Sequence, residues 1–432
     1  MSTPRRRQAG EGGISEYATK AGTRYLIKYG YARPDGSKAV VLKRGYLTRR
    51  AAAAGLREQL SNVDRGIHVA PSNITVREHM TIWLDGLRKE PSTVASYQKN
   101  VRLHVEPHIG SLRLSALTGT MLTKLYHQLE QTGRVDGNGG LSARTVRYIH
   151  TIIHAGLGAA VRDGLLASNP ADKADPPSVK AAASPEMRFW TANELKAFLH
   201  QRYQADDDLA IAWSLLAATG LRRGEALALR WADVDFDSSR ISVRRSATII
   251  KHKGEQGEIL IGPPKSGRPR TVDLDPGTLA TLKAYKAEQG TLALMLARDG
   301  AYVLADIEGK LRHPERLSKR FVAAVIAARK SLGEDQLPTI RLHDLRHTHA
   351  TLLLAAGVPV KVVSERLGHA SAMITLGVYA HVMPGMQAEA AATFGALLSG
   401  EEPPEAGQEQ DKSPGARYHR ALRGTAIKNP VW

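Results

Sequence analysis

The stretch RLHDLRHTHAT, residues 341–351, places histidines and an arginine at helical spacing. His343 and His347 are four residues apart with Asp344 beside the first, which is close to the H-E-x-x-H pattern of zinc proteases. Arg346 lies three residues after His343, so the two side chains would share one face of a helix. A guanidinium on that face suits a phosphate better than a metal ion. The stretch therefore raises two alternatives, a zinc site and a phosphate site.

The composition favours a polyanionic partner. The chain has 432 residues, 42% of them hydrophobic, and a formal net charge of +18. Such a length predicts more than one domain, and the charge favours nucleic acid first and an anionic membrane second. The chain has no cysteine, which excludes disulfides, thiolate zinc sites and cysteine nucleophiles. We expect neither a secretory signal nor a membrane span, and therefore action in the cytoplasm.

The first 72 residues are predicted to form a small basic domain. Residues 1–75 contain fourteen Lys and Arg against five Asp and Glu. TRYLIKYGY (23–31) has strand character, and RPDGSKAVVLKRGYL (33–47) offers a Pro-Asp-Gly turn with second and third strand candidates. A helix capped by Thr48 is expected to follow and to end near Gly66. A three-stranded sheet with a helix and this charge can lie in a DNA groove.

The remainder is predicted to be mainly helical. In residues 73–175, four segments with helical spacing each begin at a Ser or Thr in a capping position, namely Thr75, Thr93, Thr118 and Ser142. Residues 176–187 read as a linker, because Pro, Ala, Ser and charged residues are mixed there. Residues 188–398 are expected to form a helical domain with a strand-rich island near 240–274. Residues 399–432 are polar and are expected to be disordered.

Four blocks of the helical domain contain the residue types that bind and attack a phosphodiester. Arg222 opens a helix, where a guanidinium and the helix N-terminal N–H groups both favour an anion. His343 and Arg346 share a helix face, and His369 precedes Tyr379 by ten residues. Each feature alone is ordinary. The blocks are TGLRRGE (219–225), PPKSGRPR (263–270), HDLRHTHAT (343–351) and LGHASAMITLGVYAHV (367–382).

These ordered motifs resemble the tyrosine recombinase, or phage integrase, family of site-specific DNA recombinases. The pattern is most similar to integrases of actinobacterial phages and integrative elements. The resemblance covers most of the chain and implies a multidomain, mainly α tyrosine recombinase fold. Residues 1–72 would be an arm-type DNA-binding domain made of a small basic β-sheet plus a helix. Residues 73–175 would be a helical core-binding domain, and 188–398 a mostly α catalytic domain with a small β-sheet.

The resemblance also implies roles for individual residues, taken motif by motif. The catalytic set would be Arg222, Lys265, His343, Arg346, His369 and the nucleophile Tyr379, with Glu225 in a supporting role. Two arginines can hold the charge that builds on a phosphodiester, a tyrosine can attack phosphorus, and a lysine can protonate the leaving oxygen. The role of His343 stays open between activating the tyrosine and holding the phosphate. His369 would donate a hydrogen bond to the phosphate.

Some assignments within the motifs have rivals. Lys251, Lys253 and Lys310 compete with Lys265 for the lysine position. Arg223, His347 and His349 are predicted to be packing or surface residues. The spacing from the Gly-His motif to Tyr379 is one residue longer than in many members of the family. The segment MPGMQAEAAATFGALL (383–398) predicts an amphipathic helix that docks either on a neighbouring protomer or on its own domain.

The implied function is that of an integrase, without a cofactor or a metal ion. It would cleave and rejoin DNA at attachment sites through a 3′-phosphotyrosine and a Holliday junction, integrating a mobile element, with excision as the reverse reaction. The partners would be core and arm sites in double-stranded DNA, three further copies in a homotetramer, an excision factor and a host DNA-bending protein. It would act on the bacterial nucleoid.

Three other functions compete with this one. A noncatalytic DNA-binding regulator on a recombinase fold would lack at least one catalytic residue, and none is missing. A host-type chromosome dimer resolvase shares the chemistry, but the extra basic N-terminal module favours an element-borne integrase. A type IB topoisomerase is disfavoured by the integrase-like motifs. The zinc alternative also weakens, because it leaves Arg222, Lys265, His369 and Tyr379 without a role.

Overall fold

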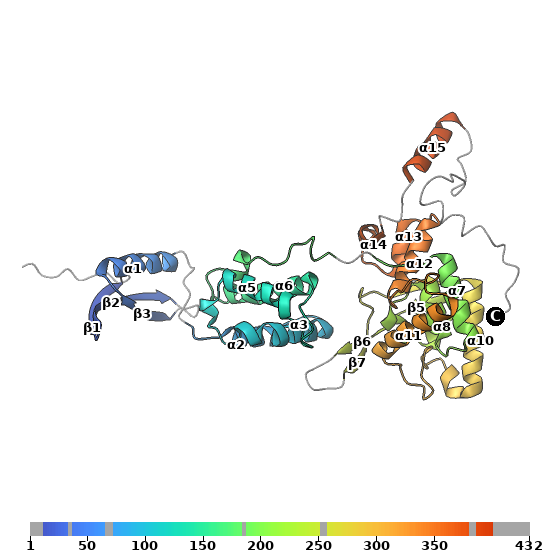
Figure 1. Cartoon of the computed structure of the whole chain (residues 1–432), viewed down its shortest axis with the longest axis horizontal. Coiled ribbons are helices and arrows are strands. Elements are labelled where there is room, and N and C mark those ends of the chain that lie inside the picture. Colours follow the sequence, from blue (N-terminus) through green and yellow to red (C-terminus); the bar gives the residue numbers. More distant parts are fainter. Residues whose placement is uncertain are drawn as a thin grey trace, which may run out of the picture. The chain divides into compact units, whose positions relative to one another are not determined.

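The structure is a computed structural model, and it describes residues 12–32, 37–64, 72–183, 187–250, 257–379 and 386–400. The chain divides into two compact units, Met1–Ser184 and Pro185–Trp432. Each unit is described by itself, and their elements are drawn in Figure 1. No helix of the described residues is long and apolar enough to span a membrane.

The first unit begins with a three-stranded antiparallel sheet in the order β1-β2-β3. Its strands are β1 (Gly13–Thr19), β2 (Gly22–Ala32) and β3 (Lys38–Tyr46), followed by helix α1 (Arg49–Asp64). Thr48 caps α1 by accepting the backbone N–H of Ala51. The predicted sheet and helix are present, but the segment after the turn forms one strand rather than two, and the additional strand is β1.

Helix α1 lies across one face of this sheet (Figure 1). Side chains alternate along a strand, so Ile27 and Tyr29 of β2 point to the same face. They pack against Ala52 and Leu56 of α1 in a small hydrophobic cluster. Lys28, between them, is exposed on the opposite face. One sheet face therefore forms the core, and the other is left open.

The rest of the first unit is helical. Its longer helices are α2 (Val76–Asp85), α3 (Pro91–His104), α5 (Gly119–Thr132) and α6 (Ala143–Arg162), with the short elements α4 (Glu106–Ile109), η1 (Leu114–Ala116) and η2 (Pro170–Lys173). Their apolar faces share a core of their own. Thr75, Thr118 and Ser142 cap α2, α5 and α6 as predicted. Thr93 does not cap α3, which begins at Pro91, because proline fits the first helical position, where its missing N–H needs no partner.

The second unit combines helices with two small sheets. It opens with α7 (Ala192–Gln204), α8 (Ala210–Thr219), α9 (Arg223–Leu227) and η3 (Trp231–Asp233). The strands are β4 (Val234–Asp235), β5 (Arg240–Val243), β6 (Ser246–Ile250), β7 (Glu258–Gly262) and β8 (Arg270–Asp273). They form the antiparallel sheets β4-β5-β8 and β6-β7, which account for the predicted strand-rich island.

Helices fill the remainder of this unit. They are α10 (Pro276–Leu292), η4 (Leu294–Ala297), α11 (Pro314–Leu332), α12 (Asp344–Ala355), α13 (Val360–Leu367), α14 (Ala372–Tyr379) and α15 (Met386–Ser399). The predicted fold class, mainly α with a small sheet, is confirmed for this unit. The tail from residue 401 onward lies outside the described residues.

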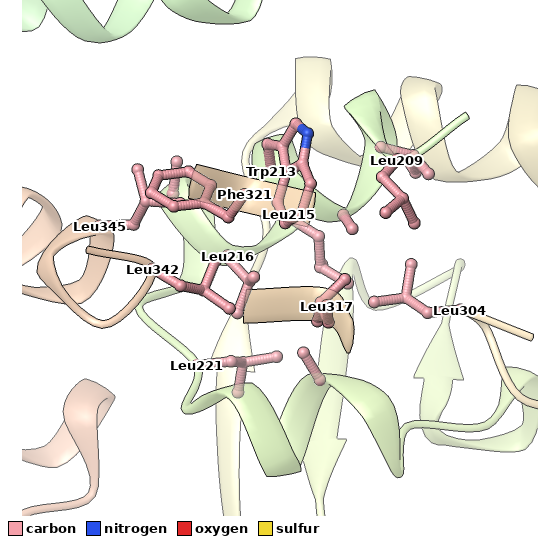
Figure 2. Packing of buried hydrophobic residues seen from close by; sticks show 14 of the residues in the cluster. Leu209, Trp213, Leu215, Leu216, Leu221, Leu304, Leu317, Phe321, Leu342 and Leu345 are labelled. Carbon is pink, nitrogen blue, oxygen red and sulfur yellow. The ribbon is translucent and has the colours of Figure 1, made fainter. Parts of the chain in front are cut away.

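The core of the second unit fixes two of the sequence motifs in place. Trp213 of α8 packs edge-on against Phe321 of α11, with ring centroids 5.2 Å apart. Figure 2 shows Leu221 of the first arginine motif beneath this core, and Leu342 and Leu345 of the second arginine segment at its edge. Because protein cores are close-packed, the polar residues next to these anchors have little freedom to shift.

Candidate active site

The first arginine motif forms a tight turn between α8 and α9. Gly220 ends α8 in the left-handed region, with φ of 63°, a conformation that suits glycine. Arg222 then caps α9, and its backbone N–H donates to Oε2 of Glu225 at 2.9 Å. The Arg222 guanidinium also donates, through Nη1, to Oε1 of the same carboxylate at 2.9 Å. Glu225 therefore fixes both the backbone and the side chain of Arg222.

Glu225 also forms an ion pair with a second arginine, which the sequence analysis did not single out. Arg270, at the start of β8, donates Nη1 to Oε1 at 3.0 Å and Nη2 to Oε2 at 2.7 Å of Glu225. The carboxylate is fully buried. Burial opposes its ionisation, but the hydrogen bonds and charges of Arg270 and Arg222 outweigh burial and lower the pKa of Glu225. Arg270 is the last residue of the PPKSGRPR motif, and its place in that motif is the sequence signal that could have identified it.

Arg346 of α12 is buried and reaches the ends of two other helices, α8 and α13. Its Nη1 donates to the carbonyl of Gly220 and its Nη2 to the carbonyl of Leu367, each at 2.7 Å. Arg222 approaches the same corner, with Nη2 3.4 Å from the Gly368 carbonyl. Burial and then the charge of Arg222 lower the pKa of Arg346 to about 9, so it stays protonated at neutral pH.

The cluster carries more positive than negative charge. Arg222, Arg270 and Arg346 face one carboxylate, that of Glu225, and the charges of Arg222 and Arg270 add to burial in lowering the pKa of Arg346. Like charges gathered in a partly buried site repel one another unless an anion joins them. The cluster is therefore suited to a phosphate group.

Tyr379 lies at the end of α14 and is 1% exposed. Its hydroxyl is 2.7 Å from Nδ1 of His347 on α12. Burial raises the pKa of Tyr379 to about 12, and the nearby charge of Arg346 offsets only part of that rise. His347, predicted to be a packing or surface residue, has the tyrosine hydroxyl as its hydrogen-bond partner.

His343 and His369, the two histidines predicted to be catalytic, lie near the contact between His347 and Tyr379. His343 stacks edge-on to His347, with ring centroids 5.2 Å apart, and stays open to solvent on its outer side. Desolvation by neighbouring protein atoms, then His347 and Arg346, lowers the pKa of His343. His369 follows the left-handed Gly368 and has its Nδ1 2.8 Å from Oγ1 of Thr375. Desolvation and the charges of Arg346 and Arg222 lower its pKa to about 4.

Lys265 was also predicted to belong to the site, but among the described residues no contact joins it to the arginine cluster. It lies exposed in the turn between β7 and β8, closed by a hydrogen bond from the Gly267 N–H to the Pro264 carbonyl at 2.8 Å. Its rival Lys310 is also exposed and pairs with Glu308, with Nζ 2.6 Å from Oε2. The rivals Lys251 and Lys253 lie outside the described residues.

Other residues of the motifs have structural partners. His349 is buried; its Nδ1 lies 2.8 Å from the Ala217 carbonyl, and its Nε2 accepts Nε of Arg366 at 3.0 Å. Arg223 donates Nη1 to Oγ of Ser318 at 2.7 Å. Asp344, the acid of the zinc-like pattern, accepts Nη2 and Nε of Arg341. Among the described residues, no group of three or more His, Asp or Glu is arranged to hold a metal ion.

Comparison with known proteins identifies a family match in the second unit. Residues 188–385 match the phage integrase family. A tyrosine recombinase XerC-like protein of Caldanaerobacter subterraneus subsp. tengcongensis is 26% identical over 87% of this chain and 96% of that protein. The ICEBs1 integrase of Bacillus subtilis is 29% identical over 70% of this chain and 78% of its own length. The integrase of Mycobacterium phage D29 is 26% identical over 79% of this chain and 87% of its own length.

Solved structures share the fold. The Tn1549 transposon integrase in complex with a circular intermediate DNA superposes with a TM-score of 0.60 at 20% identity, covering 74% of this chain and 99% of that one. A lambda integrase dimer bound to a COC′ core site gives a TM-score of 0.50 at 15% identity, covering 87% and 96% of the two chains. Residues 188–385 are therefore assigned to the phage integrase family, and the chain as a whole is similar to tyrosine recombinases and integrases.

Proposed function

We propose that this recombinase cleaves and rejoins DNA at attachment sites through covalent attack by Tyr379. The observation that carries the proposal is the approach of Arg222 and Arg346 to one backbone corner, formed by Gly220 and Leu367–Gly368. The two arginines are far apart in the sequence, and Arg346 is near enough to Tyr379 for its charge to act on the phenol. A nucleophile beside two anion-binding guanidiniums suits attack on a phosphodiester.

The arginines would act on the charge of the transition state. Attack on phosphorus builds negative charge on the nonbridging oxygens, and guanidiniums offer planar, permanently charged donors for them. Fixed donors of this kind are worth roughly 2.7–4 kcal/mol each. Glu225 and Arg270 fix Arg222 before DNA arrives, so little reorganisation would be needed during the reaction. His343 and His369, whose lowered pKa values keep them neutral, would donate N–H groups to the same phosphate.

The tyrosine would remain linked to the 3′-phosphate, and the 5′-oxygen would leave. Lys265 would protonate that oxygen as a general acid. Because it lies in an exposed turn between β7 and β8, it would have to meet the scissile phosphate when DNA is bound. The phosphotyrosine conserves the energy of the broken bond, so rejoining needs no cofactor. A wild-type adduct with a nicked suicide substrate, located at Tyr379 by peptide mass spectrometry, tests this proposal; a noncatalytic regulator would form no adduct.

The open face of the N-terminal sheet would bind arm sites. Lys28 is exposed on the face away from α1 and pairs with Leu42, which is 55% exposed. Arg44 lies over the ring of Tyr17, at 5.8 Å from its centroid, and Tyr17 pairs with Arg24. A basic and partly apolar sheet face can enter a major groove. Deleting residues 1–70 should spare core-site cleavage yet weaken integration; surviving arm-site footprints would overturn the arm assignment.

The remaining parts of the proposal concern assembly. Residues 73–175 would grip the core site, and four protomers would exchange strands on two duplexes through a Holliday junction. The helix α15 has Phe394, Leu397 and Leu398 exposed at 64%, 64% and 74%, which suits docking on a neighbouring protomer. An excision factor and a host DNA-bending protein would set the direction of the reaction on the nucleoid in the cytoplasm.

A further inference from the structure

The hydroxyl of Tyr379 has one hydrogen-bond partner among the described residues, and it is His347. The Nδ1 to Oη distance is 2.7 Å, and the two ring centroids are 5.7 Å apart. We propose that His347 is a catalytic base, which takes the proton of Tyr379 as that hydroxyl attacks phosphorus. This inference rests on the proposed function, because it assumes that Tyr379 is the nucleophile.

The other two histidines of the site are less well placed for this task. His369 already has its Nδ1 at 2.8 Å from the Thr375 hydroxyl. His343 presents its ring edge-on to His347, and it makes no hydrogen bond to Tyr379 in the described part of the chain. A general base must lie within hydrogen-bond reach of the proton that it removes. Geometry therefore favours His347 over both.

The surroundings of His347 keep its imidazole neutral. Burial lowers the pKa of His347; Asp344 opposes this effect, and Arg346 and Arg341 add to it. The carboxylate of Asp344 is engaged by Arg341, so it does not compete for the tyrosine proton. His343 on the same helix and His369 before α14 face the same region, and the pKa of each is lowered as well. In the neutral tautomer that carries its proton on Nε2, Nδ1 of His347 presents a lone pair to which the tyrosine hydroxyl donates, and this is the tautomer that the proposal uses.

The proposed step is balanced in atoms and electrons. The Oη–H bond of Tyr379 breaks, and its proton moves to Nδ1 of His347 while Oη forms a bond to phosphorus. The bond between phosphorus and the 5′-oxygen breaks, and that oxygen takes a proton from the general acid. Rejoining reverses each transfer.

Proton transfer must accompany the attack rather than precede it. The pKa of Tyr379 is about 12, whereas that of His347 is below the usual 6.5, so the phenol does not ionise beforehand. As the bond to phosphorus forms, the phenol oxygen loses basicity and the transfer becomes favourable. The imidazolium that results lies beside Arg346, and the bound phosphate offsets this repulsion.

Comparing His347→Asn with His347→Ala distinguishes a role of His347 as a base from a role as a structural contact. Asparagine places an amide oxygen near the position of Nδ1, so it can accept the tyrosine hydrogen bond but cannot take the proton. The full chain is followed in single turnover on a nicked suicide substrate from about pH 5.5 to about pH 9, with gel-shift binding as a check on folding. His349→Asn is the matched control, since that histidine lies on the same helix without touching Tyr379.

A catalytic base predicts a specific pattern. Both His347 variants should bind DNA but cleave slower by on the order of 10²-fold or more, and they should lose the fall in rate at acid pH that wild type and His349→Asn share. A substrate with sulfur in place of the leaving 5′-oxygen should restore cleavage to Lys265→Ala and not to His347→Asn. Wild-type rate and pH profile in His347→Asn would overturn the inference, as would rescue by sulfur. An adduct formed by Tyr379→Phe would instead overturn the proposed function.

Discussion

Arg270 and Glu225 form a buried bidentate ion pair, with N–O distances of 3.0 and 2.7 Å. The same carboxylate holds Arg222, so a residue at the start of β8 determines the position of an arginine at the start of α9. Arg270 also donates Nε to the carbonyl of Arg366 at 3.0 Å, which joins β8 to α13. One side chain thus links two of the four sequence motifs to the helix that leads into the fourth.

Replacing Arg270 should therefore weaken both stability and cleavage. Arg270→Met leaves Glu225 with Arg222 alone, and we expect a loss of about 3 kcal/mol in the free energy of unfolding. Single-turnover cleavage of bound DNA should slow by roughly 10- to 100-fold, because Arg222 loses its fixed geometry. The control is Arg240→Met in the exposed pair with Asp273, where the change should stay within about 0.5 kcal/mol. Equal losses in both variants would contradict this account.

Gly220 is expected to tolerate no side chain. It has a positive φ, and a Cβ there would lie 2.8 Å from Cδ2 of both His349 and Leu367. Gly220→Ala should destabilise the protein by roughly 1–3 kcal/mol and slow cleavage, since the Gly220 carbonyl accepts Arg346. Chemical denaturation measures the first effect. Gly300→Ala, where a Cβ would meet open space, should behave as wild type.

His349 should make the protein less stable in mild acid. Burial, followed by the charge of Arg366, lowers its pKa to about 4 from the usual 6.5, so the unfolded chain binds its proton first as pH falls. Stability is then complete above about pH 6.5 and is lost towards pH 4, by about 3 kcal/mol for this group. Denaturation of His349→Gln across this range should show a shallower slope. The surface control for this substitution is the same change at the exposed His127 of α5.

A test with an altered leaving group shows whether Lys265 or Lys310 is the general acid. Lys265→Ala should slow cleavage by on the order of 10²–10⁴-fold, and a sulfur at the 5′-bridging position should restore the rate, because a thiolate leaves without a proton. Lys310→Ala removes a lysine already paired with Glu308 and should cleave normally. Slow cleavage by Lys310→Ala, with normal cleavage by Lys265→Ala, would reverse the assignment.

The sequence predicted the motifs better than it predicted the contacts between them. Arg222, His343, Arg346 and Tyr379 could be proposed from the ordered motifs and the family that those motifs resemble. The link from Arg270 to Glu225 could not, since it joins positions 45 residues apart that meet only when β8 packs beside α9. The contact of His347 with Tyr379 could not be predicted for the same reason: its partner lies 32 residues away on α14.

Local signals had similar limits. Thr93 looked like a helix cap, yet α3 begins at Pro91 with Glu90 at the cap, three residues earlier. The turn in residues 33–36, on which the N-terminal strand assignment relied, lies outside the described residues. Strand β1 was not singled out, because its exposed and half-buried residues do not alternate in hydrophobicity along GISEYAT. Tertiary pairing with β2, rather than local pattern, makes it a strand.

The central claim is that Tyr379 is the nucleophile, and its most direct test removes one oxygen atom. Tyr379→Phe keeps the ring that packs at the end of α14, so attachment-site binding should be retained. A nicked suicide substrate is incubated with the variant and with wild type, and the products are separated on a denaturing gel. Wild type should form a covalent protein–DNA adduct, and Tyr379→Phe should form none. A persistent adduct in the variant would contradict the account.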